Sequence, residues 1–231
     1  MTKETKEDNV EKSAAATLVA SIGRNSWLLG IFSLLCTAII AATHWQTADQ
    51  IAVQKRQAKL KALYQIVPRD QHDNDLLGDS RELMIEALGH NEAQRVFLAR
   101  QNTVPHTLIY PVTTPQGYSG DINLLVGINI KNSTISGVRV VSHRETPGLG
   151  DKIEQRKSPW ILSFNGRSLG EPDNSGWTVK KDGGAFDGFT GATITPRAVV
   201  HAVASTLQYH QQQAETLLLQ FPHQSTRETS R

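Results

Sequence analysis

The sequence predicts an α+β protein with a single N-terminal transmembrane helix followed by one domain, in which helices flank a mainly antiparallel sheet. Three observations predict this class. A long uncharged apolar run lies near the N-terminus, short apolar or alternating runs separated by turn residues fill the middle, and a helically spaced apolar stripe follows them. The 231 residues are enough for one or two domains with a proper core.

Composition excludes several classes of protein. The hydrophobic fraction of 39% and the charged fraction of 20% are ordinary for a folded chain and argue against wholesale disorder. A formal net charge of +2 gives no broad basic footprint, so nucleic acid is not expected as a partner. Because Cys36 is the only cysteine, an intramolecular disulfide, an all-cysteine zinc or iron–sulfur site and a C-x-x-C-H haem attachment are excluded.

The apolar run at 25–43 predicts a transmembrane anchor behind a short N-terminal tail at 1–24. It has 19 residues without a charge, which as a helix span about 28 Å, close to the thickness of the bilayer's apolar core. Trp27 and Trp45 lie near its ends, where interfacial aromatic residues are expected. A buried core helix and a cleaved signal peptide are the alternatives; the long charged leader and the lack of a clear A-x-A site favour an uncleaved anchor. Lys and Arg residues, four before the span and five shortly after it, do not decide its orientation.

Residues 44–78 are predicted to form a stalk helix and a linker. Gln46–Val67 carries apolar residues at helical spacing, Pro68 ends the helix, and Arg69–Gly78 is polar and loop-like. A further short helix is expected at Glu82–Leu88, ended by Gly89.

Four strands are expected next, where apolar residues begin to recur at every second position. The run Ile122–Ile130 is apolar enough to form a central strand buried on both faces. Tight turns such as Lys131–Ser133 favour antiparallel neighbours. The expected strands are Gln94–Ala99, Thr107–Val112, Ile122–Ile130 and Ile135–Ser142.

The first loop of chemical interest is His143–Gly150, directly after the last expected strand. Its proline and two glycines indicate a defined turn that brings its polar residues together. The triplet His143-Arg144-Glu145 resembles the H-x-E of zinc deaminases, but the P-C-x-x-C partner is absent, so no metal site is predicted. A solvated turn at the end of a strand is the alternative to a binding loop.

The second loop, Asp187–Thr193, precedes a predicted helix. Thr195 is expected as its N-cap and Pro196 as its first residue, with apolar residues at helical spacing running toward Leu219. Free N–H groups and the positive end of the helix dipole converge near Thr193, which favours a phosphate there. An ordinary capped helix behind a glycine turn explains the same residues.

The sequence of this second loop, DGFTGAT, resembles the flavinylation motif D-g-x-[ST]-G-A-T of the FMN-binding domain family. In that family an FAD:protein FMN transferase joins the last threonine to FMN through a phosphoester bond. The resemblance therefore implies covalent FMN on Thr193, and it implies no catalytic residue and no metal. The loop ETPGLG is similar to the family loop that faces the flavin. The remaining cofactor-binding residues that the resemblance implies are Asp187, Thr190, Gly191, Ala192, Glu145, Thr146 and Leu149.

These motifs, the Gly117–Ile128 stretch and the single anchor resemble the G subunits of Rnf (Rsx) electron transport complexes over nearly the whole chain. The related C subunit of the sodium-pumping NADH:quinone reductase shares the loops. The resemblance implies an FMN-binding domain at 79–222, and the polar composition of residues 223–231 predicts a flexible tail. It implies a relay without turnover of its own, within a complex that couples electron transfer between ferredoxin and NAD to ion translocation.

The same resemblance implies a single-pass protein of the bacterial inner membrane, with its domain on the periplasmic side and the other subunits as partners. Three alternatives remain. The chain is a membrane-anchored FMN-binding regulatory or sensory domain, or part of a complex that keeps a redox-sensing transcription factor reduced, or a structural subunit whose Thr193 loop only caps a helix.

Overall fold

The structure is a computed structural model that describes the backbone of residues 4–221 and the side chains of residues 26–51, 53–54 and 56–221. The chain divides into two compact units between Lys55 and Arg56. The predicted flexible tail, 223–231, lies outside the described residues.

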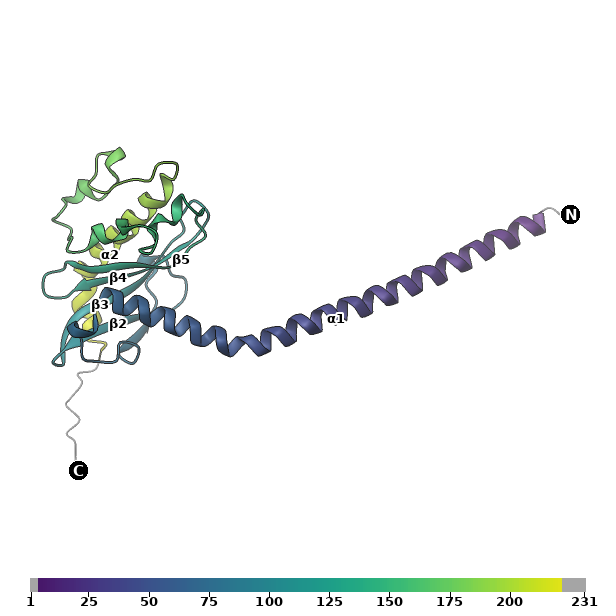
Figure 1. The fold of residues 1–231 in the computed structure, drawn as a ribbon, viewed down its shortest axis with the longest axis horizontal. Helices are drawn as coiled ribbons and strands as arrows, with labels where there is room; N and C mark the ends of the chain where they lie inside the picture. Colours follow the sequence, from purple (N-terminus) through teal and green to yellow (C-terminus); the bar gives the residue numbers. More distant parts are fainter. Residues whose placement is uncertain (1–3, 222–231) are drawn as a thin grey trace, which may run out of the picture. The chain divides into compact units, whose positions relative to one another are not determined.

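Helix α1 runs from Glu4 to Ile66 and contains the predicted anchor (Figure 1). By length and composition, its part from Ser26 to Ile66 can cross a membrane, and none of its most apolar window is buried in the structure. Large apolar side chains are exposed along it, with Leu34 at 74% and Trp45 at 81%. Such exposure is costly in water and favourable in lipid, so it agrees with a membrane span.

A five-stranded antiparallel sheet in the order β1-β2-β3-β4-β5 forms the centre of the second unit. Its strands are β1 (Ser80–Leu83), β2 (Gln94–Gln101), β3 (Val104–Thr114), β4 (Ile122–Asn129) and β5 (Ile135–Ser142). The predicted fold class, α+β with an apolar N-terminal helix and an antiparallel sheet flanked by helices, is confirmed. The expectation of a helix at Glu82–Leu88 is wrong. Residues 80–83 pair with β2 as an edge strand, and only Glu86–Leu88 forms a 3₁₀ turn, which Gly89 ends at φ 80°.

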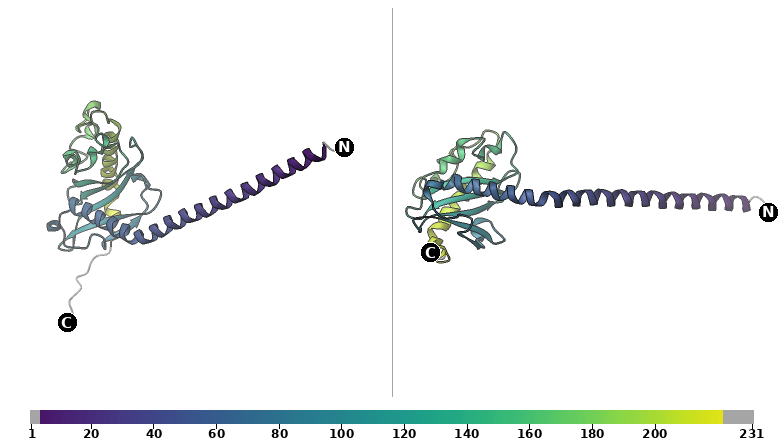
Figure 2. Two further views of the ribbon diagram at one scale, coloured as in Figure 1. Left: turned by 45° about the vertical axis from the view of Figure 1, so that its right-hand side comes forward. Right: turned by 60° about the horizontal axis from the view of Figure 1, so that its bottom comes forward.

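Two helices cover opposite faces of this sheet, as the period of two along the strands requires (Figures 1 and 2). Val96, Leu98, Leu108, Tyr110 and Val126 pack in the core that contains helix α2 (Ile194–Leu218). The alternate residues Phe97, Ala99, Ile109 and Leu125 pack in a second core with the end of α1. Strand β4 is therefore buried on both faces, as predicted.

The end of the predicted stalk is part of the domain. Leu63 and Ile66 are buried against the sheet. Gly127 and its cross-strand partner Gly137 leave the space that Ile66 fills, since a Cβ on Gly127 would lie 2.2 Å from Ile66 Cγ2. Arg139 Nη2 donates to the Gln65 carbonyl oxygen at 2.9 Å, near the negative end of the α1 dipole. The end of α1 thus packs in one hydrophobic core with residues of the sheet.

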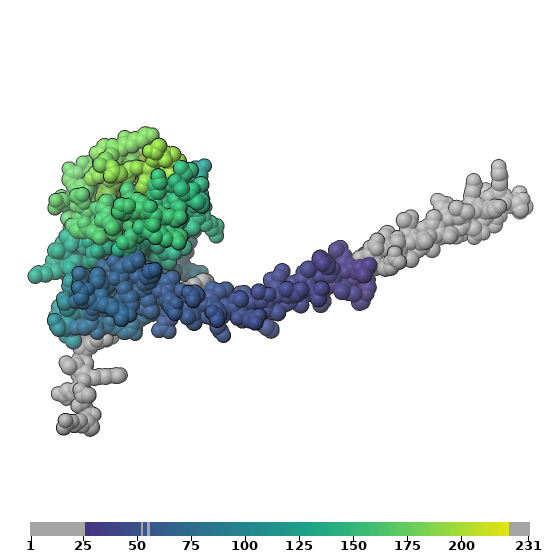
Figure 3. Space-filling view, in the orientation of Figure 1, coloured from purple at the N-terminus to yellow at the C-terminus, as the bar shows by residue number. Residues whose placement is uncertain are grey.

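Between β5 and α2 the chain forms short 3₁₀ turns around a cluster of aromatic rings. In Figure 3 this green segment and the blue end of α1 occupy opposite ends of the visible face of the domain. The turns are η3 (Gly150–Ile153), η4 (Pro159–Phe164), η5 (Asn174–Gly176) and η6 (Lys180–Asp182). Ring centroids in the cluster lie as close as 4.7 Å, between Phe164 and Phe186. The loop before α2 packs on these rings through Phe189, which contacts Trp160.

Helix α2 begins two residues earlier than predicted. Thr193 occupies the N-cap position and its side chain makes no capping hydrogen bond. The expectation that Thr195 caps the helix is wrong, because Thr195 is completely buried inside the first turn. Pro196 is the third helical residue, where its missing N–H still costs nothing, since the first four N–H groups of a helix have no partner within it.

Candidate cofactor site

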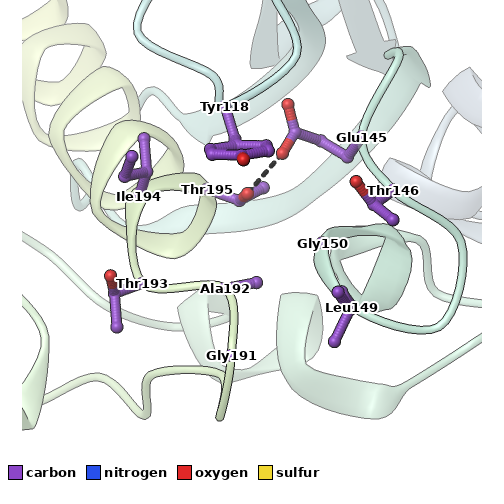
Figure 4. Close-up of a pocket in the computed structure, with 10 residues that line it drawn as sticks. All are labelled: Tyr118, Glu145, Thr146, Leu149, Gly150, Gly191, Ala192, Thr193, Ile194 and Thr195. Atoms are coloured by element: carbon purple, nitrogen blue, oxygen red, sulfur yellow. Dashed lines mark hydrogen bonds between the residues drawn. The ribbon is translucent and has the colours of Figure 1, made fainter.

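Three loops meet around a cavity of about 350 Å³, which we call the loop cavity (Figure 4). The first loop joins β3 to β4, the second follows β5, and the third precedes α2. The residues that line the cavity are Tyr118, Glu145, Thr146, Leu149, Gly150, Gly191, Ala192, Thr193, Ile194 and Thr195. Its size is within the range of small-molecule sites in proteins.

Glu145 joins the three loops. Its side chain is 4% exposed. Oε1 accepts a hydrogen bond from the Ser119 N–H at 3.0 Å, and Oε2 accepts one from the Thr195 hydroxyl. Figure 4 shows Glu145 and Thr195 facing each other across the top of the cavity. A buried carboxylate requires such partners, so the three loops are held together at this point.

Two glycines, Gly117 and Gly150, allow the three loops to approach Glu145 closely. A Cβ on Gly150 would lie 2.8 Å from Glu145 Oε2 and 2.9 Å from Thr195 Oγ1. A Cβ on Gly117 would lie 2.2 Å from the Gly120 carbonyl oxygen. A side chain at Gly150 would therefore push the loops apart, and one at Gly117 would distort the β3–β4 loop and displace Glu145.

His143 supports the Glu145 loop from behind. The Glu145 N–H donates to His143 Nδ1 at 3.0 Å, so Nε2 carries the proton and donates to Glu154 Oε1 at 2.9 Å. Arg156 also pairs with Glu154, and this hydrogen bond is the main cause that lowers the pKa of the Glu154 carboxyl. Among the residues that the structure describes, no group of three or more His, Cys, Asp or Glu is placed to hold a metal ion.

Apolar side chains form the rim of the loop cavity. Tyr118 is 68% exposed, Ile194 45% and Leu149 40%. In Figure 4, Thr146 and Leu149 lie on one side of the cavity, Thr193 and Ile194 on the other, and Tyr118 at the top. Gly191 has φ 81°, and a Cβ there would lie 3.3 Å from Leu149 Cδ2. An open cavity with an apolar rim and a carboxylate at its back suits a flat ring system that carries polar groups.

A second cavity, of about 330 Å³, adjoins the first and shares Gly191 and Thr193 with it. We call it the basic hollow, because Lys181 and Arg197 are among its lining residues. The complete lining is Val179, Lys181, Gly188, Phe189, Thr190, Gly191, Thr193 and Arg197. Thr193 thus lines both cavities, at the start of a 25-residue helix.

The loop that contains Thr193 is fixed at its start by the aromatic cluster. Trp160 Nε1 donates to the Asp187 carbonyl oxygen at 2.7 Å. Phe186 and Phe189, on either side of Asp187 and Gly188, are buried, and Phe189 packs on Trp160 with ring centroids 5.0 Å apart. The Asp187 carboxylate pairs with Lys180 Nζ at 2.6 Å on the surface.

The structure brings together most of the residues that the sequence indicates. Around the loop cavity lie Glu145, Thr146, Leu149, Gly191, Ala192 and Thr193. Thr190 lines the basic hollow, whereas Asp187 is not among the lining residues of either cavity. Sequence reasoning missed Tyr118, Gly150, Ile194 and Thr195 as lining residues. Tyr118 lies in the Gly117–Ile128 stretch and Gly150 in the ETPGLG loop, so the family resemblance covered both without naming them as site residues. Thr195 was expected only as a helix cap, and nothing in the sequence marked Ile194.

Comparison with known proteins gives the family of this chain. Residues 117–208 match the family described as FMN-binding domain, and residues 1–66 match the family described as RnfG N-terminal region. The G subunit of the ion-translocating oxidoreductase complex of Vibrio atlanticus (strain LGP32) is 44% identical over 203 residues, which cover 88% of this chain and 97% of that protein. This chain belongs to the family of these G subunits. The G subunit of Shewanella amazonensis is 49% identical over 189 residues, which cover 81% of this chain and 87% of that protein.

The resemblance to the Rnf G subunits is therefore confirmed. The FMN-binding match includes all the residues that line the loop cavity and the basic hollow. Among solved structures, the crystal structure of Shewanella oneidensis NqrC aligns with a TM-score of 0.44 and 23% sequence identity, over 65% of this chain and 73% of that one.

Loss of the Glu145 carboxylate is expected to loosen the three loops. Glu145→Ala leaves the Ser119 N–H and the buried Thr195 hydroxyl without their acceptor, and should lower the free energy of unfolding by about 2–4 kcal/mol. Glu145→Gln keeps a carbonyl acceptor and should cost less than half as much. Urea unfolding of the full-length chain in detergent, followed by near-UV circular dichroism, measures both. Equal losses in the two variants would contradict this role for Glu145.

Trp160 and Trp177 offer a matched pair for the loop anchor. Trp160 is 8% exposed and donates to Asp187, whereas Trp177 is 9% exposed and its buried Nε1 has no hydrogen-bond partner in the described part of the chain. Replacement by phenylalanine removes similar volume at both positions. Trp160→Phe should therefore lower the free energy of unfolding by about 1 kcal/mol more than Trp177→Phe. The same urea titration tests this, and a larger loss for Trp177→Phe would refute it.

Proposed function

We propose that this chain is the membrane-anchored flavin subunit of an ion-translocating oxidoreductase complex, and that it relays electrons through FMN attached covalently to Thr193. The position of Thr193 carries the proposal. It is half-buried at the N-terminus of α2, on the wall of a cavity with an apolar rim, inside the segment that matches the FMN-binding domain family.

The residues around Thr193 fit a flavin nucleotide. The loop cavity offers Tyr118, Leu149 and Ile194 for contact with the ring. The start of α2 favours a phosphate by about 0.3–1 kcal/mol at an exposed site. The first turn of α2 contains no acidic residue that would oppose that charge. Because the Thr193 side chain does not cap the helix, its hydroxyl is available for a bond to phosphorus.

Attachment follows from phosphoryl chemistry. A flavin dinucleotide, FAD, is the donor, and an FAD:protein FMN transferase is the catalyst. The Thr193 Oγ1–P bond forms to the FMN phosphorus while the P–O bond within the diphosphate breaks. AMP leaves, and the hydroxyl proton passes to a base of the transferase. The step oxidises and reduces nothing, and it leaves the ring free for redox chemistry because the link is at the opposite end of the nucleotide.

Bound FMN would supply electron-transfer chemistry, and this chain's residues would position it. Covalent attachment prevents loss of the cofactor between transfers. Thr146 and Leu149 lie at the exposed edge of the loop cavity, so another subunit's redox centre can approach the ring there. The names of these relatives describe subunits of an ion-translocating oxidoreductase complex, which supports electron transfer coupled to ion movement. Ferredoxin and NAD are proposed as the soluble carriers on the resemblance to the Rnf G subunits alone.

Helix α1 would anchor the chain in the bacterial inner membrane through residues 25–43. The length and the exposed apolar surface of the helix support a single span. We place the domain on the periplasmic side, as the resemblance to the Rnf G subunits implies.

Flavin that stays with the denatured polypeptide tests the proposal. Wild-type chain co-expressed with a flavin transferase should show a fluorescent band after denaturing electrophoresis, and Thr193→Ser should keep some label because it retains a hydroxyl. Thr193→Ala should show none. A wild-type band without fluorescence, or a fluorescent Thr193→Ala band, would contradict attachment at this residue.

A further inference from the structure

We propose that the basic hollow is the subsite for the anionic phosphates of the flavin nucleotide, with Lys181 as the residue that binds them. This inference rests on the proposed attachment of FMN to Thr193. The nucleotide would then occupy both cavities. Its ring lies in the loop cavity, and its phosphates lie on the other side of Thr193, in the basic hollow.

The two cavities share a wall at the acceptor residue. Gly191 and Thr193 line both of them. A nucleotide bonded to Thr193 Oγ1 therefore has its phosphorus at the boundary between the cavities. Gly191, with φ 81° and no side chain, keeps this boundary thin.

The charges on the two linings are opposite. The loop cavity has the buried Glu145 carboxylate at its back, whereas the basic hollow is lined by Lys181 and Arg197 and by no acidic residue. A diphosphate would be repelled by Glu145 and attracted by the two cations, and the positive end of the α2 dipole adds to that attraction. Electrostatics thus sets the direction in which the nucleotide lies.

Arg197 is fixed in the wall of the hollow. Its Nη2 donates to Asp182 Oδ1 at 2.7 Å, and Nε makes a second bond to the same carboxylate. This pairing raises the pKa of the Arg197 guanidinium and leaves its charge largely balanced by Asp182. Arg197 is therefore the weaker of the two cations for an incoming phosphate.

Lys181 is the stronger of the two cations for binding a phosphate. The 3₁₀ turn that contains it places Lys180 and Lys181 in different surroundings. Lys180 N donates to the Phe186 carbonyl oxygen at 2.7 Å, and Gly183, at φ 88°, closes the 3₁₀ turn. Lys180 Nζ is directed to Asp187, whereas Lys181 lines the hollow. Lys181 contributes to lowering the pKa of Asp182, but the main cause is the hydrogen bond from Arg197. Among the described residues no salt bridge engages the Lys181 ammonium, so it can bind a phosphate without first breaking a pair.

The subsite takes part in both stages of the attachment. While the Thr193 Oγ1–P bond forms, the second phosphate of FAD lies in the hollow and departs with AMP. The remaining phosphoester keeps one negative charge, which stays beside Lys181. Lys181 thus favours the transfer and remains paired in the product.

Lysine labelling of the product provides the first test. The full-length chain, with and without FMN attached, is treated in detergent with an acetylating reagent, and the label on each lysine is measured by mass spectrometry. Lys181 should react at least about threefold more slowly in the flavinylated chain, while Lys180, already paired with Asp187, and Lys131, on the β4–β5 turn, should react at the same rate in both. Unchanged Lys181 labelling in a flavinylated chain contradicts this inference alone. A wild-type chain that acquires no FMN contradicts the proposed function and this inference together.

Attachment rates provide the second test. With FAD and the transferase, Lys181→Ala should lower kcat/KM for FMN attachment about tenfold, the value expected for one charge-assisted hydrogen bond. Lys181→Arg should restore most of the rate, and Lys131→Ala should match the wild type. Near-UV circular dichroism of Lys181→Ala should remain that of the wild type, since this exposed side chain carries no packing. An unchanged rate for Lys181→Ala would overturn the assignment.

Discussion

One buried carboxylate determines the geometry of the site. Glu145 accepts hydrogen bonds from Ser119, 26 residues earlier, and from Thr195, 50 residues later. Taking a carboxylate out of water is costly, and these bonds offset the cost only when all three loops are in place. The loops after β3 and β5 and the start of α2 are therefore coupled, and the loop cavity forms only where they meet.

The same coupling places Thr193. Because Thr195 is held by Glu145, the first turn of α2 is fixed relative to the sheet, and the N-cap residue two positions earlier is fixed with it. From the other side, Trp160 fixes the beginning of the loop at Asp187. Thr193 is thus positioned between two anchored points, with an apolar rim and a carboxylate on one side and two cations on the other. This asymmetry is what a nucleotide with a ring at one end and phosphate at the other requires.

Much of this fold follows from periodicity in the sequence. Alternating apolar residues predicted β2 to β5, and the continuous run in β4 predicted burial on both faces. Local rules failed where distant contacts decide the outcome. Thr195 satisfies the preference for an N-cap, but its hydroxyl bonds to Glu145 instead. Residues 80–83 have no strand pattern of their own, and they form a strand by pairing with the edge of β2.

The candidate site was predictable only in part for the same reason. Motif resemblance indicated the residues of two loops, and the structure shows six of them on one cavity. Tyr118 lies in a stretch that the resemblance covers. The pairing of Glu145 with Thr195 could not be predicted in this way, because the two residues are 50 positions apart. Lys180 and Lys181 are adjacent and chemically identical in the sequence, and only the 3₁₀ turn shows that they lie on different sides.

Mapping the FMN mass to one threonine tests the central claim most directly. Trypsin should release the peptide 182–197 from the flavinylated chain, because cleavage follows Lys181 and Arg197. This peptide contains Thr190, Thr193 and Thr195, so fragmentation must distinguish three hydroxyls. An increment of FMN minus one water is expected on Thr193 alone. An increment on Thr190 or Thr195, or an unmodified peptide from a chain that retains flavin, would contradict it.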